Sequence, residues 1–264
     1  MKGAKNDSLV IFASSLLMAK PVLVDRVPEI EDIKRISELL ENLGAQVEHL
    51  GYGKYRITAG KIKNTSIDSE IAKRLRASIL LTASLLARAG KVEFPHPGGC
   101  VIGERPIDVF LDGYKALGAD IKYQNEVYAV SAVKLRGAKF IFRSISVTGT
   151  EAMIMASSLA EGVTILKNCA CEPEVKSLAD FLNSCGAKIS GAGTTQITIR
   201  GVKKLNGGKH CTIPDRIEAG SFAILGALTG NLIKITKCAP NHLDSLLSIL
   251  EKAGAKIKLG PDSI

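Results

Sequence analysis

The sequence repeats one pattern four times, and this repeat limits the possible folds more than any other feature. An amphipathic helix ends at a Gly-Ala pair and passes into a strand at residues 36–50, 110–123, 178–190 and 246–259. The glycines of these pairs, Gly44, Gly118, Gly186 and Gly254, are separated by 74, 68 and 68 residues. A fixed period of this kind is typical of a fold assembled from like units.

Each unit contains more than this helix and strand. A more apolar helix precedes it, ends in a small residue and enters a strand, at residues 14–24, 84–94, 158–166 and 227–235. Alternating apolar and polar residues at 55–58, 128–130 and 196–200 predict a further strand that closes each of the first three units. With a short strand in front, one unit reads β-α-β-α-β-β. The sequence therefore predicts an α/β fold whose helices, rich in Ala, Leu and Ile, are buried, and whose repeated glycines form left-handed helix caps.

The fourth unit lacks the closing strand that the alternation predicts in the other three. After residues 256–260 the chain continues only through Pro261 to Ile264, and the first unit has no strand before Lys5. We therefore expect a chain clipped at both ends, with an open sheet edge in its fourth unit.

Composition narrows the possible functions. Hydrophobic residues make up 46% of the 264 residues and charged residues 23%, as in an ordinary globular protein. The net charge of +9 favours an anionic partner, but Lys and Arg are scattered and aromatic residues, which stack on bases, are only 5%. We expect a small anionic ligand rather than nucleic acid. The six cysteines and four histidines show no zinc spacing, so we expect no metal site and mostly buried, unreactive thiols.

The apolar run at residues 9–19 resembles a short secretory signal. No small-residue cleavage site with a clean break follows it, and residues 22–24 continue into a predicted strand. No segment is long and apolar enough to span a bilayer. We therefore expect a cytoplasmic protein with no membrane partner.

The segment 95–109, PHPGGCVIGERPIDV, combines glycines that free the backbone with prolines that stiffen it. It carries Cys100, Arg105 and Asp108, and binding groups often sit on such loops. The alternative is a plain connection with an incidental cysteine.

The first helix of each unit has a polar start, at residues 3–6, 74–78, 146–151 and 215–220. Helix N-termini attract anions, so Lys5, Arg76 and Thr148 would form an electropositive ring if the units surround an axis. The Ser, Thr, Asp and Asn residues there could instead serve only as helix caps. Together with the cysteine loop, these starts favour a phosphate site.

Six segments resemble the UDP-N-acetylglucosamine enolpyruvyltransferase family, and the resemblance runs along the whole chain. They are GAKN (3–6), RASILL (76–81), PGGCVIGERPID (97–108), SVTGTE (146–151), LAEGVTILKNCACEPEV (159–175) and IPDRIEAGSF (213–222). The resemblance implies an inside-out α/β barrel with two domains of three units each and an active site between them. Residues 1–213 would form one domain, and residues 214–264 the first, incomplete unit of the other.

The resemblance also implies a reaction: transfer of an enolpyruvyl group from phosphoenolpyruvate to the 3-hydroxyl of UDP-N-acetylglucosamine, the first committed step of peptidoglycan synthesis. It implies no metal or organic cofactor. Cys100 matches the family's catalytic cysteine, which protonates the enol carbon and is alkylated by fosfomycin. Lys5, Asn6 and Arg105 match phosphoenolpyruvate-binding residues. The positions that match UDP-N-acetylglucosamine-binding residues are Arg76, Arg105, Pro106, Ile107, Asp108, Val109, Ser146 and Val147.

The match has departures and gaps. Ser144 and Phe110 stand where the family often has a basic residue and a histidine, and the roles of Glu172, Asp215, Arg216 and Glu218 stay open. The family's general base corresponds to a position beyond Ile264, and loss of a positioned base usually costs about 100- to 10,000-fold in rate. We therefore expect low turnover from these 264 residues in a phosphate-release assay. The alternative is a truncated, non-catalytic relative that binds UDP-sugar weakly or not at all.

Overall fold

The computed structural model describes residues 1–98 and 106–264. The first unit contains α1 (Lys5–Ser14), η1 (Ser15–Leu17), β1 (Val22–Asp25), α2 (Glu31–Asn42), β2 (Gln46–Gly51) and β3 (Lys54–Thr58). The second contains α3 (Ser69–Ala72), η2 (Arg76–Ser78), α4 (Ile79–Ala89), β4 (Lys91–Pro95), α5 (Asp108–Ala116), β5 (Asp120–Gln124) and β6 (Val127–Ser131). The third contains β7 (Lys139–Ile141), α6 (Val147–Ser158), β8 (Val163–Lys167), α7 (Pro173–Ser184), β9 (Lys188–Ser190) and β10 (Gln196–Arg200). β11 (Lys209–Cys211) follows the third unit, and the fourth unit contains α8 (Arg216–Thr229), η3 (Pro240–His242) and α9 (Asp244–Lys252).

The first three units share one strand order, which confirms the repeat. In each, the last strand lies between the other two and runs antiparallel to both, giving β1-β3-β2, β4-β6-β5 and β8-β10-β9. The predicted closing strands at 55–58, 128–130 and 196–200 are β3, β6 and β10. A hydrophobic alternation of period 2 identified them because one face of each sheet is covered by helices.

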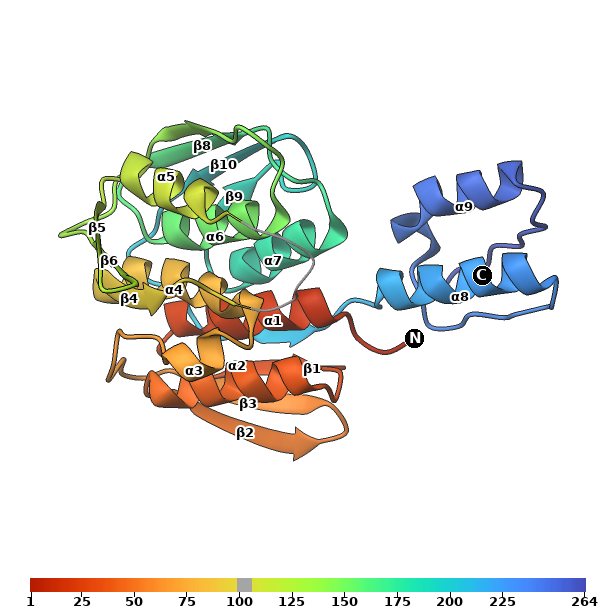
Figure 1. The fold of residues 1–264 in the computed structure, drawn as a ribbon, viewed down its shortest axis with the longest axis horizontal. Coiled ribbons are helices and arrows are strands. Elements are labelled where there is room, and N and C mark those ends of the chain that lie inside the picture. The colour runs from red at the N-terminus through yellow and green to blue at the C-terminus, as the bar shows by residue number, and fades with distance from the viewer. Residues whose placement is uncertain (99–105) are drawn as a thin grey trace.

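The chain segments that follow the three sheets in sequence each pair in parallel with the first strand of another sheet. β7 pairs with β8 in parallel, and Ser66 forms a parallel bridge to Glu93 of β4. β11 follows the third unit in sequence but pairs in parallel with β1 of the first. The first three units therefore close on themselves, with sheets on the outside and helices inside (Figure 1).

The core of this three-unit body is helical and aliphatic. All of α4 from Ile79 to Leu86 is buried, as are the residues of α1 from Asp7 and of α6 from Gly149. Residues 9–18 of the predicted apolar run thus lie in α1, in η1 and at Met18, inside the core, whereas Ala19 is exposed.

The repeated glycines have the left-handed conformation that the sequence predicts. Their φ angles are 101° at Gly44, 90° at Gly118, 102° at Gly186 and 97° at Gly254. Each follows the end of a helix, where a residue without Cβ reverses the chain at the lowest cost.

The fourth unit differs from the prediction. Residues 227–235 and 246–259 were expected to include strands, but between 231 and 260 the structure has helices and no regular strand. A bridge joins Thr236 to Ser263, and Ile235 and Ile264 exchange backbone hydrogen bonds. A hollow of about 720 Å³ lies between α8 and the segments 230–235 and 254–260. Strand geometry needs a hydrogen-bonding partner, and these two segments have no central strand between them.

The apolar residues form two separate clusters. The larger lies in the three-unit body between Leu9 and Leu205, and the smaller involves Ala219, Ile235, Cys238, Leu243 and Leu247. Figure 1 shows α8 and α9 projecting from one side of the three-unit body. Among the described residues, no helix combines the length and hydropathy needed to cross a membrane.

Candidate functional site

The first helices of the three units lie together, as an anion site between them requires. α4 packs against both α1 and α6. Asp7 in the first turn of α1 and Glu151, just after the first turn of α6, interact electrostatically. The polar starts of α1 and α6 therefore face the same region of the three-unit body.

Lys5 and Asn6 are exposed on the first turn of α1. The Lys5 ammonium lies 3.4 Å from a carboxylate oxygen of Asp32, and the Lys5 amide donates to Asp215 at 3.3 Å. Asp32 is a partner that the sequence analysis did not identify. The Lys5 side chain is half exposed, so it can also meet an anionic ligand.

Arg76 lies at the start of the second unit's buried helix and reaches both ends of the cysteine loop. Its guanidinium donates to the carbonyl of Pro97 at 3.0 Å and to that of Pro106 at 3.5 Å. Cys100 and Arg105 lie outside the described residues. Arg76 thus links the two described edges of that loop to the start of α4.

Residues 106–109 follow the loop and lead into α5. Pro106 and Asp108 are exposed and Val109 is half buried, whereas the Ile107 side chain is buried in the core. Ile107 could therefore reach a ligand only through its backbone.

Ser146 and Val147 start the third unit's buried helix, and both are half buried. The Ser146 hydroxyl accepts from the Gly149 amide at 3.1 Å, and the Ser146 carbonyl accepts from the Thr150 hydroxyl at 2.7 Å. Ser146 therefore caps α6, as the alternative interpretation of these residues held. A cap of this kind leaves other amides of the first turn for an anion.

The two positions that depart from the family pattern differ in environment. Phe110 is buried in the core, whereas Ser144 is exposed. A buried phenyl ring contributes packing but no hydrogen bond.

A buried carboxylate beside Lys5 and Asn6 was missed by the sequence analysis. Asp7 is completely buried, and its Oδ2 lies 2.8 Å from Nε2 of His210 and accepts from the Ile213 amide at 3.0 Å. Its Oδ1 has no hydrogen-bonding partner among the described residues. These contacts fix the first turn of α1 to the chain segment that leads into α8.

Glu151 is the second buried carboxylate of this region. Burial raises its pKa well above the usual value, and the nearby carboxylates of Glu174, Asp7 and Glu172 raise it further. Its Oε1 is buried without a partner among the described residues. Glu151 therefore holds its proton at a pH where an exposed glutamate would be ionised.

We expect Glu151→Gln to remove a pH-dependent loss of stability. The folded pKa of Glu151 is raised above its unfolded value near 4.5, so its contribution is fully present below that pH and is lost as pH rises through the folded pKa. Urea unfolding should give equal free energies for wild type and variant near pH 4, with the variant increasingly more stable above it. Glu251→Gln on exposed α9 is the control. Parallel pH curves for wild type and Glu151→Gln would contradict this account.

The junction with the fourth unit contains further charged residues. Arg216 at the start of α8 donates through Nε to both carboxylate oxygens of Glu174, at 3.1 and 3.3 Å, and Glu174 is 2% exposed. Asp215 caps α8 by accepting from the Ile217 and Glu218 amides, each at 2.9 Å. Glu218 in turn accepts from the Lys2 amide at 3.5 Å.

The N-terminal residues complete this junction. Gly3 forms an antiparallel bridge with Pro214, and the Asp215 amide donates to the Lys2 carbonyl. Met1 packs against the smaller hydrophobic cluster. The three-unit body and the fourth unit are therefore connected by two antiparallel segments, the N-terminal residues and the residues that lead into α8.

The described cysteines and histidines show no metal site. No group of three or more His, Cys, Asp or Glu residues within 1–98 and 106–264 is arranged to hold a metal ion. Burial raises the pKa of the Cys169 thiol to about 11 and also raises that of Cys185 and Cys238. These three thiols are therefore poor nucleophiles, whereas Cys171 and Cys211 are exposed.

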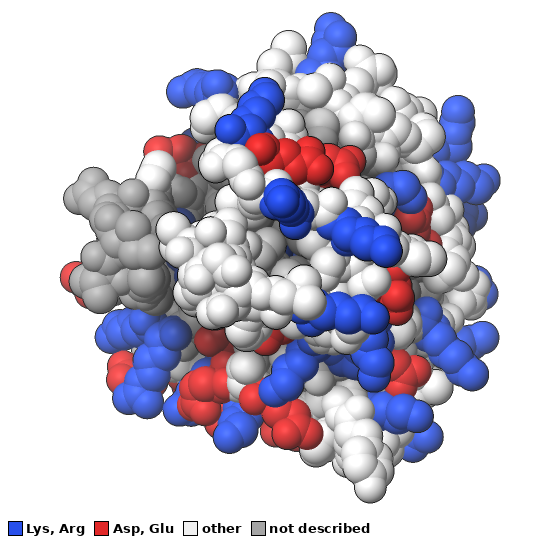
Figure 2. All heavy atoms as spheres, turned by 90° about the vertical axis from the view of Figure 1, so that its right-hand side faces the viewer, with Lys and Arg blue, Asp and Glu red and all other residues white. Residues whose placement is uncertain are grey.

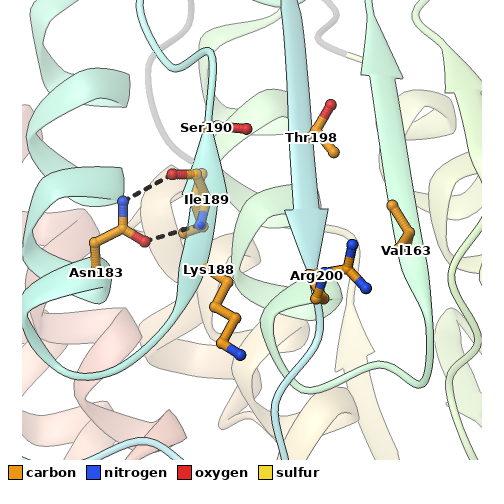
Figure 3. A pocket seen from close by; sticks show the side chains of 7 residues that line it. All are labelled: Val163, Asn183, Lys188, Ile189, Ser190, Thr198 and Arg200. Atoms are coloured by element: carbon orange, nitrogen blue, oxygen red, sulfur yellow. Dashed lines mark hydrogen bonds between the residues drawn. The ribbon is translucent and has the colours of Figure 1, made fainter.

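A surface hollow of about 450 Å³ lies elsewhere, against the third unit's sheet (Figure 3). Lys188, Ser190, Thr198, Arg200 and Val163 line it, together with Ile189 and Asn183. The Asn183 amide is already paired with the backbone of Ile189, at 2.9 Å in both directions. None of the predicted site residues within 1–98 and 106–264 lines this hollow.

The chain matches, over residues 1–264, the family model described as EPSP synthase (3-phosphoshikimate 1-carboxyvinyltransferase). It belongs to this family. The fold of buried helices inside three like sheets is thus the family's fold, and the predicted fold class is confirmed.

Curated relatives in this family resemble the chain throughout its length. A UDP-N-acetylglucosamine 1-carboxyvinyltransferase of Koribacter versatilis (strain Ellin345) is 45% identical over 268 residues, covering 100% of this chain and 62% of the relative. One of Coxiella burnetii (strain Dugway 5J108-111) is 45% identical over 261 residues, covering 98% and 60%. The chain therefore spans about three fifths of the length of these relatives.

Solved structures show the same fold at lower identity. The enolpyruvyl transferase NikO from Streptomyces tendae superposes with a TM-score of 0.86 at 19% identity, covering 100% of this chain and 63% of that one. An EPSP synthase from Acinetobacter baumannii gives 0.74 at 17% identity, covering 100% and 62%. At such identities the likeness concerns the fold alone.

Proposed function

We propose that this chain carries the phosphoenolpyruvate and UDP-N-acetylglucosamine binding residues of an enolpyruvyl transferase. The observation that carries the proposal is the 45% identity, along the whole chain, to relatives named UDP-N-acetylglucosamine 1-carboxyvinyltransferase. The reaction would join the enolpyruvyl carbon to the sugar 3-hydroxyl and release inorganic phosphate. It would serve peptidoglycan synthesis in the cytoplasm and would need no cofactor.

The exposed cations of the three-unit body suit these anionic ligands. Lys5 and Asn6 would meet phosphoenolpyruvate at the start of α1, where a helix N-terminus adds partial positive charge. A Lys ammonium paired with Asp32 at 3.4 Å keeps other donor positions for a phosphate. Arg105 would add a second cation, and Cys100 the proton for the enol carbon.

Arg76 would lie in the part of the site that binds UDP-N-acetylglucosamine. Its contacts with Pro97 and Pro106 place it against the cysteine loop and the residues that lead into α5. Asp108 and the backbone of residues 106–109 would contact the uridine, and the first turn of α6 at Ser146 and Val147 would bind the diphosphate.

The domain division is part of the same proposal. The larger hydrophobic cluster corresponds to the expected domain 1–213, and the smaller cluster to the expected unit 214–264. Met1 packs on the smaller cluster, so the N-terminal residues would contribute to both domains.

Titration of UDP-N-acetylglucosamine into the 264-residue chain tests the proposal, with Arg76→Ala as the variant. A charged hydrogen bond is worth about 1.5–3 kcal/mol, so we expect saturable binding by wild type and affinity about 10- to 100-fold weaker for Arg76→Ala. Arg74→Ala, two residues away and exposed, is the matched control and should bind as wild type does. An absence of binding by wild type would favour the alternative of a non-catalytic relative. Equal affinities for the two variants would exclude the role of Arg76.

A further inference from the structure

The surface hollow of about 450 Å³ on the third unit's sheet, here called the sheet hollow, places two cations side by side. Lys188 on β9 lies directly opposite Arg200 on β10, and in the next outward-facing row Ser190 lies opposite Thr198. Figure 3 shows the two cations at one end of this strand pair and the two hydroxyls further along it. Side chains directly opposite each other have Cβ atoms about 4.5–5.5 Å apart, so two cations there repel each other.

The other two sheets provide a comparison, because the repeat gives each of them an equivalent row. The position two residues after the repeated glycine is Lys188 in the third unit, Gln46 in the first and Asp120 in the second. Gln46 lies opposite Thr58, and Asp120 lies opposite Ser131. Of these three rows, only that of the third unit brings two like charges together. The strand pairing of the fold therefore does not require a cation pair at this position.

No carboxylate among the described residues neutralises the pair. Neither Lys188 nor Arg200 forms a salt bridge within this part of the chain, and no Asp or Glu lines the sheet hollow. The carboxylate of Glu161, just before β8, is paired with Lys134 instead. By contrast, Figure 2 shows Asp and Glu lying among Lys and Arg on the end of the molecule that carries α8 and α9. The sheet hollow thus has positive charge without a counter-charge from the described residues.

The donors of the sheet hollow are those that a phosphate ester requires. A guanidinium can bind a phosphate with two parallel N–H donors, and an ammonium adds a further charged donor. The hydroxyls of Ser190 and Thr198 lie about 7 Å further along the strands, within the length of a diphosphate or a small ester. A volume of about 450 Å³ lies within the range of sites that take small molecules.

We propose that the sheet hollow binds a small phosphorylated metabolite, with one phosphate group between Lys188 and Arg200 and the rest of the molecule along Ser190 and Thr198. The bound anion replaces the repulsion between two cations by an attraction to each of them. Lys188, Ser190 and Arg200 are exposed, so binding is weak and falls as the salt concentration rises. This site does not depend on the proposed function, because none of the residues assigned to that function within the described chain lines it.

Isothermal titration with inorganic pyrophosphate at low salt tests the proposal. Wild type should bind, and Lys188→Gln and Arg200→Gln should each weaken this binding about 10-fold or more, because each removes a charged hydrogen bond. Lys122→Gln is the matched control: Lys122 is exposed on the equivalent strand of the second unit, opposite Ala129, and the substitution changes the net charge equally. Arg76→Ala should keep the binding in the sheet hollow, which separates it from the proposed substrate site.

Urea unfolding at low salt without phosphate gives a second readout. Lys188→Gln should unfold at a higher urea concentration than wild type, because it removes the repulsion with Arg200, whereas Lys122→Gln should not. Pyrophosphate should raise the unfolding midpoint of wild type more than that of Lys188→Gln, since a ligand stabilises the folded state that binds it.

Three results would overturn the proposal. The first is a wild type that binds no pyrophosphate, whatever its affinity for UDP-N-acetylglucosamine. The second is binding that is lost in Arg76→Ala but kept in Lys188→Gln and Arg200→Gln, which would place the anion at the proposed substrate site. The third is an equal loss of affinity in Lys122→Gln, which would show an attraction to the net charge rather than to the sheet hollow.

Discussion

Replacing Arg88 by Ala should lower the free energy of unfolding by about 3 kcal/mol or more, because charged hydrogen bonds contribute about 1.5–3 kcal/mol each. Arg88 lies on α4 of the second unit but donates to three carbonyls of the first. Its guanidinium reaches Leu16 at 2.8 Å, Met18 at 2.9 Å and Gly60 at 2.8 Å. Burial lowers the pKa of Arg88 because removal from water disfavours the charged form. The variant would lose the hydrogen bonds between the two units, and the three carbonyls would have to be hydrated instead.

Urea unfolding measures this loss of stability, and two further variants serve as comparisons. Arg88→Lys should recover only part of the loss, since an ammonium cannot reproduce the planar fork that serves three acceptors. Arg56→Ala removes an exposed arginine paired with Glu48 at 3.0 Å, and surface pairs of this kind contribute about 0–1 kcal/mol. If Arg88→Ala cost no more than Arg56→Ala, the guanidinium would not be joining the units.

Replacing Arg216 by Ala should cost about 3–5 kcal/mol at neutral pH, because the buried carboxylate of Glu174 would lose its charge partner. Arg216 is the first residue of α8 and Glu174 lies in the first turn of α7. Glu151 and His242 also interact electrostatically with Glu174.

A double variant separates the ion pair from packing. Glu174→Gln combined with Arg216→Gln should be more stable than Arg216→Ala alone, because it leaves no unpaired buried charge. Urea unfolding of both variants and wild type at neutral pH gives the comparison. A loss for Arg216→Ala below about 1 kcal/mol, the value of a surface pair, would contradict a structural role for this contact.

The sequence predicts the parts of this fold that depend on local pattern. The left-handed positions after the helices could be predicted because glycine is the residue that adopts this conformation at the lowest cost. These positions are Gly44, Gly118, Gly186 and Gly254. The closing strands could be placed because side chains alternate between the core and the solvent. The fourth unit could not be predicted in the same way, since residues 231–235 have strand character in sequence but no central strand beside them.

The contacts that define the candidate site depend on residues far apart in the chain. Asp7 and His210 are separated by 203 positions, and Glu174 and Arg216 by 42. No periodic pattern reports such pairs. A local signal did exist, because Asp7 and Glu151 are acidic residues within apolar helices, and a buried acid requires a partner or a proton. The burial of the Ile107 side chain and the two carbonyl contacts of Arg76 likewise depend on the packed structure.

The most direct test of the proposed function is a titration that compares two ligands of the family. UDP-N-acetylglucosamine and 3-phosphoshikimate should be titrated separately into the same preparation of the 264-residue chain. Saturable binding of UDP-N-acetylglucosamine, with none for 3-phosphoshikimate at the same concentrations, is the result that we predict. Binding of 3-phosphoshikimate in preference to the UDP-sugar, or of neither, would contradict the assignment of these residues to sugar-nucleotide binding.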